Sequence, residues 1–158
     1  MAYGPASESA KPALEWIARY DGAFGLFIGG RWTNGKNDAG FDVINPATTV
    51  RLARVTQAGQ ADVDAAVAAA RKAFPAWSAL SGHARARHVY GLARAVQKHS
   101  RLLAVLESLD NGKSIRETRD LDIPLVARHL THHAGWAQLM GSGGGRRAGC
   151  PGPGSRES

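Results

Sequence analysis

The chain has 158 residues, a single cysteine and a formal charge of +7, from 20 Lys and Arg against 13 Asp and Glu. This length favours one domain, and one cysteine excludes an internal disulfide, as expected of a cytoplasmic protein. No apolar run reaches the roughly 18 residues that a membrane span needs. The basic residues lie scattered among acidic ones, so we expect no binding to nucleic acid.

Residues 1–23 predict a lead segment with one short helix. Ser7 or Ser9 can cap this helix, because a hydroxyl accepts hydrogen bonds from the free N–H groups of a first turn. Pro12 lies near the start, where the N–H that proline lacks would have no partner in any case.

Short strands are the pattern of residues 24–55. Gly29-Gly30 separates 26–28 from 31–33, and two glycines supply the positive φ angles of a tight hairpin turn. A strand that includes Phe41 and Val43 should stop at Asn45-Pro46. The alternation over 50–55 predicts a half-exposed strand. We expect a small antiparallel region.

Residues 61–111 predict three successive helices. The first has Val63, Val67 and Phe74 on one face, and Pro75 should end it. Ser81 and Ser100 are suitable N-caps for the second and the third. The two later helices are expected to bury Val89, Leu92, Ala93 and Val96, and then Leu102, Leu103, Val105, Leu106 and Leu109.

The helical pattern continues beyond Asn111-Gly112, which should end the third helix in a left-handed conformation. Ser114 and Glu117 have capping-box spacing, which predicts a short helical turn. A last helix is expected over 124–139. The sequence therefore predicts a mostly α-helical chain with a small strand region near its N-terminus.

The composition changes in the tail, 141–158. It holds seven Gly, two Pro and three Arg, and no Leu, Ile, Val, Phe, Tyr or Trp. Such a segment cannot bury enough apolar area to offset the entropy lost on ordering, so we expect it to be disordered.

Three histidines on the last predicted helix are the strongest candidate metal ligands. His129 and His133 lie four residues apart on one face, as two zinc ligands would, with His132 beside them. A third ligand would have to come from elsewhere, and the glutamate of an HExxH motif is absent. Packing beside Trp136 or exposure to solvent is the favoured interpretation.

Other candidate sites have simple explanations. Cys150 lies between Gly149 and Pro151 without a neighbouring base, so it is a poor nucleophile. The glycine run 141–145 has no helix after it, unlike a phosphate loop. The possible carboxylate pairs, Asp110 with Glu117 and Asp120 with Asp122, have the spacing of caps and surface charges.

Five segments of the chain together resemble the aldehyde dehydrogenase family. They are LFIGGRW at 26–32, FDVINPAT at 41–48, DVDAAVAAARKAFPAW at 62–77, LESLDNGKSIRET at 106–118 and HHAGWA at 132–137. They occur in the family's order and spacing over about 25–139. The resemblance implies an α/β parent fold and NAD(P)-dependent oxidation of an aldehyde to a carboxylic acid.

In that family a cysteine attacks the aldehyde and forms a thiohemiacetal, an asparagine stabilises the oxyanion, and a glutamate activates water. All of these residues lie downstream of the HHAGWA segment, so no residue of this chain is expected to be catalytic or to bind NAD(P). The resemblance implies an N-terminal fragment, inactive alone, of a homo-oligomeric enzyme. The alternative is a helical interaction module that binds a full-length relative.

Some relatives bind a monovalent cation through backbone carbonyls before the NP turn and an aspartate. Val43, Ile44 and Asp122 match these positions. Occupancy is not expected, because the family's site also needs a carbonyl from further along the chain.

The chain departs from the family pattern in two places. Thr49 stands where glycine usually follows NPAT, and the tail does not continue into a strand. The tail is typical of GC-rich coding sequence read out of frame, or of a truncated gene. We therefore divide the chain into a lead (1–23), the N-terminal part of the cofactor and bridging domain (24–140) and a tail (141–158). Its apolar helix faces should then lack the sheet that they cover in the family.

Overall fold

The computed structural model describes residues 9–35 and 39–142. The first helix, α1 (Lys11–Ala18), has a proline in its first turn, as the sequence predicted. Ala10, and not the predicted Ser9, is the N-cap residue, although Ser9 Oγ accepts a hydrogen bond of 3.3 Å from the N–H of Lys11. The helix buries Ala13 and Ile17. Ser7, the other predicted cap, lies outside the described residues.

Five short strands follow the first helix. They are β1 (Ala23–Phe24), β2 (Leu26–Ile28), β3 (Arg31–Thr33), β4 (Gly40–Ile44) and β5 (Arg51–Thr56). The predicted hairpin is confirmed: β2 and β3 pair antiparallel, and Gly29 and Gly30 have φ angles of 61° and 82°. Both glycines therefore adopt the left-handed conformation that this tight turn requires.

The other three strands form a mixed sheet in the order β1-β5-β4. β4 and β5 pair antiparallel, whereas β1 runs parallel to β5. The turn at 45–50 connects β4 to β5, and the two strands pair side by side. β1 pairs with the opposite edge of β5, which makes β5 the central strand. The prediction of a mostly helical chain with a small strand region is confirmed, although the strand pairing includes this one parallel edge.

The long helix α2 (Gln60–Ala79) contradicts one prediction. Pro75 does not end the helix but lies inside it. A proline removes one hydrogen bond of the helix, but here the helix continues on both sides of it. Ser78 Oγ donates to the carbonyl oxygen of Pro75 at 3.1 Å, which supports the turn after the proline. The helix ends four residues later, where Leu80 has an extended backbone.

The next two helices are α3 (Gly82–Lys98) and α4 (Ser100–Asn111). Ser81 caps α3, because its side chain accepts from the N–H of Ala84 at 3.2 Å. Ser100 is not the cap of α4 but its first residue. One residue, His99, joins the two helices, so it occupies the cap position. Gly112 ends α4 with a φ of 78°, as predicted.

The last helical run is continuous from 115 to 142. It consists of α5 (Ile115–Glu117), a π-helical turn η1 (Thr118–Asp122) and α6 (Ile123–Ser142). Ser114 caps the run by accepting from the N–H of Glu117 at 3.3 Å. The two helical segments predicted here are confirmed, and the wide turn η1 joins them.

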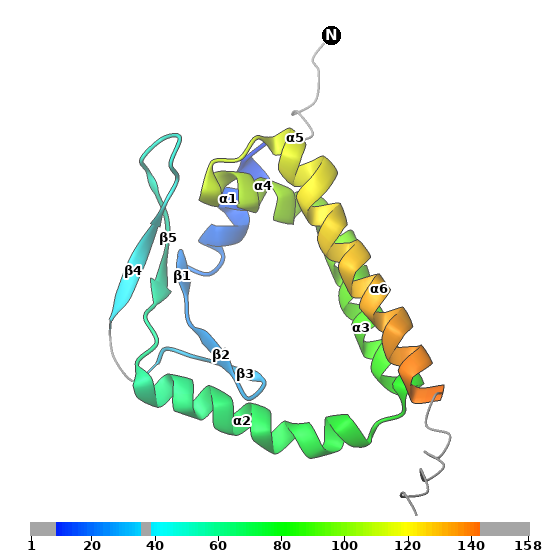
Figure 1. The fold of residues 1–158 in the computed structure, drawn as a ribbon. Helices are drawn as coiled ribbons and strands as arrows, with labels where there is room; N and C mark the ends of the chain where they lie inside the picture. Colours follow the sequence, from blue (N-terminus) through cyan, green and yellow to red (C-terminus); the bar gives the residue numbers. More distant parts are fainter. Residues whose placement is uncertain (1–8, 36–38, 143–158) are drawn as a thin grey trace, which may run out of the picture.

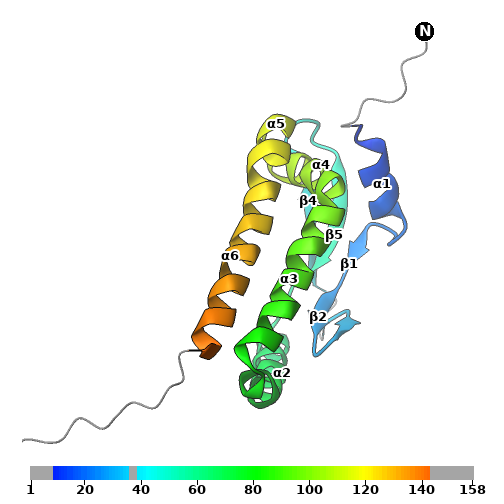
Figure 2. The same ribbon diagram turned by 90° about the vertical axis from the view of Figure 1, so that its right-hand side faces the viewer.

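The best-packed part of the molecule is the pair of antiparallel helices α3 and α6, which lie side by side in Figures 1 and 2. The buried residues along their contact are mostly alanines: Ala86, Ala93, Ala127 and Ala134. The predicted stripe of larger residues was partly wrong, because Leu92 is 58% exposed. Small side chains let two helices approach closely, so the alanine face rather than the leucine face became the contact.

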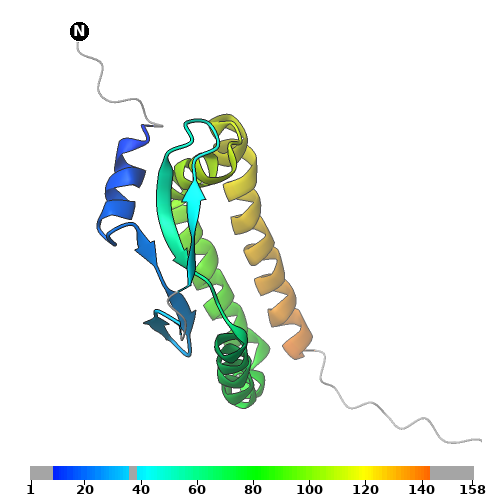
Figure 3. The same cartoon turned by 90° about the vertical axis from the view of Figure 1, so that its left-hand side faces the viewer.

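Helix α2 lies apart from this pair, along the lower edge of the molecule in Figures 1 and 3. Its apolar face is largely uncovered: Val63, Val67 and Phe74 are 49%, 45% and 64% exposed. Asp62, rather than an apolar residue, is the buried residue of this helix. The expectation that these faces would lack a covering layer agrees with their exposure.

Candidate functional site

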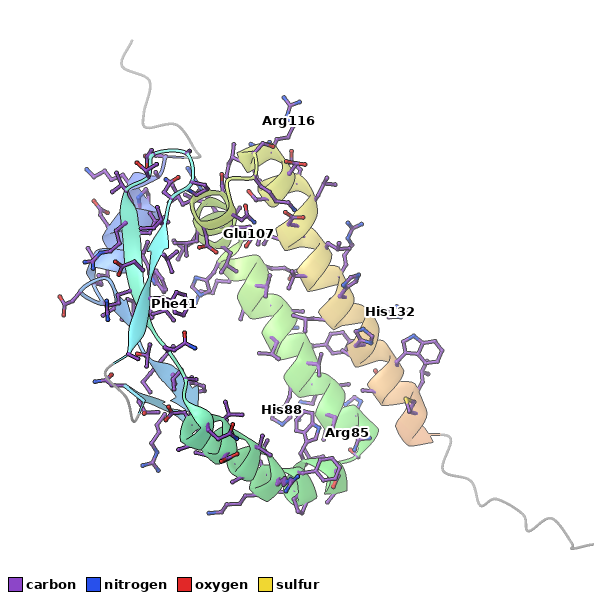
Figure 4. The ribbon with its side chains drawn as sticks, turned by 60° about the vertical axis from the view of Figure 1, so that its left-hand side comes forward. Phe41, Arg85, His88, Glu107, Arg116 and His132 are labelled. Carbon is purple, nitrogen blue, oxygen red and sulfur yellow. The ribbon has the colours of Figure 1, made fainter. Side chains whose placement is uncertain are left out.

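The histidines of α6 pack against their own helix. The indole Nε1–H of Trp136 donates to His132 Nε2 at 2.9 Å, and the rings of His132 and His133 meet edge to face at 5.4 Å. Figure 4 shows His132 on α6. Within the described ranges, no three His, Cys, Asp or Glu side chains are placed to hold a metal ion. The packing beside Trp136 is the arrangement that the sequence favoured.

The carboxylates near the π-helical turn engage other partners rather than one another. Glu117 Oε2 accepts from the hydroxyl of Ser114 at 3.1 Å. Arg119 Nε lies 2.7 Å from Asp120 Oδ1, and this hydrogen bond lowers the pKa of Asp120 below its ordinary 3.8. These are the caps and surface charges that the spacing predicted, and they offer no shared proton for acid–base chemistry.

Asp122, the carboxylate of the candidate cation site, is bound by a lysine. Lys113 Nζ lies 2.6 Å from Asp122 Oδ2, and this hydrogen bond raises the pKa of Lys113 above 10.5. The ammonium already supplies the positive charge that a metal cation would bring, so Asp122 fits an ion pair better than a cation ligand. Val43 and Ile44 lie at an irregularity in the β4–β5 register. The expectation that no cation occupies these three residues is not tested by the structure.

Lys113 was missed by the sequence analysis. It precedes Asp122 by nine residues, and the short helix α5 lies between them. No regular helix or strand brings residues nine apart into contact, so their spacing does not predict the ion pair. The only available signal was its position directly after Gly112, which turns the chain back toward the last helical run.

The N-terminus of α2 carries a buried carboxylate. α2 directly follows β5, which is the arrangement from which dinucleotide-binding folds build a phosphate site. Here Asp62 Oδ2 accepts the N–H of Gly59 at 3.0 Å, and Asp62 is only 4% exposed. This helix start therefore already has a buried negative charge of its own. Gly29-Gly30 is a hairpin turn, and Cys150 and 143–145 lie outside the described residues.

A recess of about 340 Å³ lies between the mixed sheet, α1 and α4. Its walls are mainly apolar, with two carboxylates from α4 among them: Phe24, Val43, Leu52, Leu103 and Leu106 line it together with Glu107 and Asp110. Figure 4 shows Glu107 on α4 between the strands and the helix pair. The recess combines apolar walls with acidic groups but no nucleophile, so its arrangement suits packing or binding rather than covalent chemistry.

No helix among the described residues combines the length and the apolar character of a membrane span.

Comparison with known proteins identifies the family of the chain. Residues 32–147 match the model of the aldehyde dehydrogenase family. DhaS of Bacillus subtilis (strain 168), named as an aldehyde dehydrogenase, is 46% identical over 113 residues, which are 70% of this chain and 23% of that protein.

Solved structures agree in sequence and in backbone. PnpE from Pseudomonas sp. WBC-3 has a TM-score of 0.72 at 40% identity, over 74% of this chain and 24% of that one. The NAD+ complex of aldehyde dehydrogenase from Bacillus cereus has a TM-score of 0.73 at 36% identity, over 77% and 25%. The chain spans about a quarter of the length of these relatives. It belongs to the aldehyde dehydrogenase family.

Proposed function

We propose that this chain is an N-terminal scaffold segment of an NAD(P)-dependent aldehyde dehydrogenase and does not oxidise aldehydes by itself. The parent reaction converts an aldehyde to a carboxylic acid through a thiohemiacetal. Family membership and the quarter-length coverage support this proposal. The segments that carry the resemblance match the family upstream of its nucleophilic cysteine, so no residue here is assigned a catalytic role.

The observation that carries the proposal is the uncovered apolar face of α2. Val67 and Phe74 are 45% and 64% exposed, and Trp77 at the end of the helix is 41% exposed. Burying large apolar side chains is the main stabilising term in folding. A helix that leaves such residues in water is therefore best explained as one layer of a larger fold, whose other layer comes from the rest of the enzyme.

The dinucleotide cofactor is not assigned to the described residues in this proposal. The structures of PnpE and of the Bacillus cereus enzyme were determined with NAD bound. In this chain the buried carboxylate of Asp62 lies at the N-terminus of α2 and accepts the N–H of Gly59. We assign NAD(P) to the complete parent enzyme and not to this segment. A cytoplasmic location and a homo-oligomeric parent are part of the same proposal.

An activity assay tests the proposal. The purified chain is incubated with NAD+ or NADP+ and a panel of aldehydes, and reduced cofactor is followed by its fluorescence. We expect no aldehyde-dependent signal, while a full-length relative assayed in parallel gives one. Aldehyde-dependent turnover by this chain alone would overturn the proposal.

A second candidate function is an interaction module that binds a full-length relative. The end of α6 favours it, because Trp136, Leu139 and Met140 are 53%, 64% and 75% exposed and form a further uncovered apolar surface. Light scattering after size-exclusion chromatography of the chain mixed with a full-length relative tests this function. A complex of fixed stoichiometry supports it, whereas self-aggregation of the chain without the relative in the peak rejects it.

A further inference from the structure

A groove of about 470 Å³ follows the contact between α3 and α6. Its lining includes Arg87, Gly91 and Arg94 from one face of α3, and Thr131 from α6. Positions i, i+4 and i+7 share a helix face, so the two arginines flank the glycine. The groove has the size of a small-molecule pocket, for which roughly 300–1,000 Å³ is usual.

Within the described ranges, no carboxylate forms an ion pair with Arg87 or Arg94, in contrast to the arginines of β5 and of the π-helical turn. Arg51 and Arg54 both lie within 4 Å of Asp42, and Arg119 pairs with Asp120. Arg87 and Arg94 have no ion pair or hydrogen bond within the described ranges. Neither α3 nor α6 contains an Asp or a Glu. Two guanidinium groups therefore share a groove whose two helices supply no negative charge.

Gly91 leaves room for a ligand between these two groups. A Cβ placed on Gly91 would meet no atom within 4 Å. With a rise of about 1.5 Å per residue, an anion over Gly91 would lie roughly 5 Å along the axis from each arginine, within reach of both side chains. The glycine therefore keeps open the position where the two guanidinium groups can converge.

The remaining polar groups are compatible with an anion. Gln97 and Tyr90 also line the groove and offer an amide N–H and a hydroxyl. Thr131 Oγ1 already donates to the carbonyl oxygen of Ala127 at 2.9 Å. Arginine binds phosphate oxygens in bidentate fashion, and a phosphate monoester carries close to two negative charges at neutral pH. Two guanidinium groups match that charge.

We propose that the groove between α3 and α6 binds the phosphate group of a small molecule, held by Arg87 and Arg94 over Gly91. The site is separate from the aldehyde chemistry of the family and does not depend on the function proposed above. The ligand is either the inorganic ion or an organic phosphate whose remainder lies along Tyr90.

The test is a titration of the full chain with inorganic phosphate at constant ionic strength, followed by amide chemical shifts. We expect saturable shifts confined to the residues around Gly91 and Thr131. Arg87→Gln or Arg94→Gln should weaken binding about tenfold, as expected for the loss of a charge-assisted hydrogen bond. Arg71→Gln is the matched control, because it removes the same charge from the distant helix α2.

Gly91→Glu provides a second variant that does not depend on losing an arginine. A carboxylate at 91 would lie four residues after Arg87 and three before Arg94, so it should occupy the site from within and abolish phosphate binding. Gly91→Gln has nearly the same shape without the charge, so binding lost by Gly91→Glu beyond that lost by Gly91→Gln is due to the carboxylate. Both substitutions replace a helical glycine in open space, so both variants should keep their helix content.

Three results would overturn the proposal: phosphate binding by Gly91→Glu equal to that of the original chain, equal weakening by Arg71→Gln and Arg87→Gln, or shifts that do not saturate. Phenyl phosphate identifies the source of the phosphate group. Tighter binding than that of the inorganic ion indicates an organic phosphate as ligand, and equal binding indicates the ion itself.

Discussion

The α3–α6 pair and α2 are both amphipathic, but they meet different surroundings. Ala93 of α3 and Ala134 of α6 are buried at 3% and 0% exposure. The face of α2 carries larger apolar residues, yet Val67 and Phe74 remain 45% and 64% exposed. Amphipathic periodicity thus predicts that a helix forms and which face is apolar, but it does not say whether the partner of that face is present.

The difference has a consequence for local stability. Most helix stability in proteins comes from tertiary packing of the apolar face. α3 and α6 have such packing, whereas α2 depends on its own propensity and its caps. We therefore expect backbone amides of α2 to exchange with solvent faster than those of α3, and equally slow exchange in both helices would contradict the comparison.

The largest expected effect is that of Pro75→Ala in α2. The substitution restores an N–H that can donate to the carbonyl oxygen of Arg71, and it removes a penalty of about 3 kcal/mol for proline inside a helix. Hydrogen exchange should show increased protection across α2 and no change in α3. Pro12→Ala is the control, because an N–H in the first turn of α1 has no carbonyl partner within the helix. Amide exchange in α1 should therefore change little. Unchanged exchange in α2 would show that the helix is already held by tertiary contacts.

Ala134→Leu tests the packed pair. Ala134 is fully buried, so the extra methyl and methylene groups must push α3 and α6 apart, at a cost of about 1–3 kcal/mol in the free energy of unfolding. Ala70→Leu makes the same change on the exposed face of α2. It should change the free energy of unfolding by no more than about 0.5 kcal/mol. Chemical denaturation of both variants measures the difference. Equal destabilisation would mean that α2 is as tightly packed as α3.

Much of the secondary structure was predictable because its signals are local. Gly29-Gly30, Ser81 and Gly112 each act through their own backbone or through a neighbour three residues away, and each prediction was confirmed. The prediction that Pro75 ends the helix was wrong, because a helix can lose one hydrogen bond and continue when its other turns are favourable.

Tertiary relations were harder to predict. Leu92 was expected inside, but the close approach of two helices selected the face with alanines. The edge position of β1 and the Lys113–Asp122 ion pair both join residues distant in sequence, and no spacing rule reports such contacts. The groove with Arg87 and Arg94 could not be predicted from the sequence either, because one of its walls comes from α6, which is distant in sequence.

A smaller effect is expected from Asp62→Ala, which removes the cap of α2. The carboxylate accepts the N–H of Gly59 at 3.0 Å, and loss of such a cap costs about 1 kcal/mol. Asp64→Ala is the matched control, because Asp64 lies exposed on the same turn and accepts from the Gln60 side chain. Circular dichroism during thermal melting should show lower helix content for Asp62→Ala alone. Equal loss in both variants would indicate a general charge effect at the helix N-terminus.

The smallest expected effect concerns pH and the Lys113–Asp122 ion pair, which ties the loop after α4 to the start of α6. The hydrogen bond to Asp122 raises the pKa of Lys113 above 10.5 in the folded chain. The ion pair therefore stabilises the fold fully below pH 10.5, and its contribution is lost as the pH rises through the folded pKa. Both side chains are partly exposed, at 45% and 29%, so the change should be small and weakened by salt.

Lys113→Met removes the charge and keeps most of the chain length, so its unfolding free energy should lack this alkaline decrease. Lys98→Met, on α3, is the control and should keep it. At acidic pH the dependence of stability on pH has the opposite sign, because Arg119 lowers the pKa of Asp120 below 3.8. That pair stabilises above pH 3.8 and is lost as the pH falls through the folded pKa. An alkaline decrease that persists in Lys113→Met would place its origin in other titrating groups.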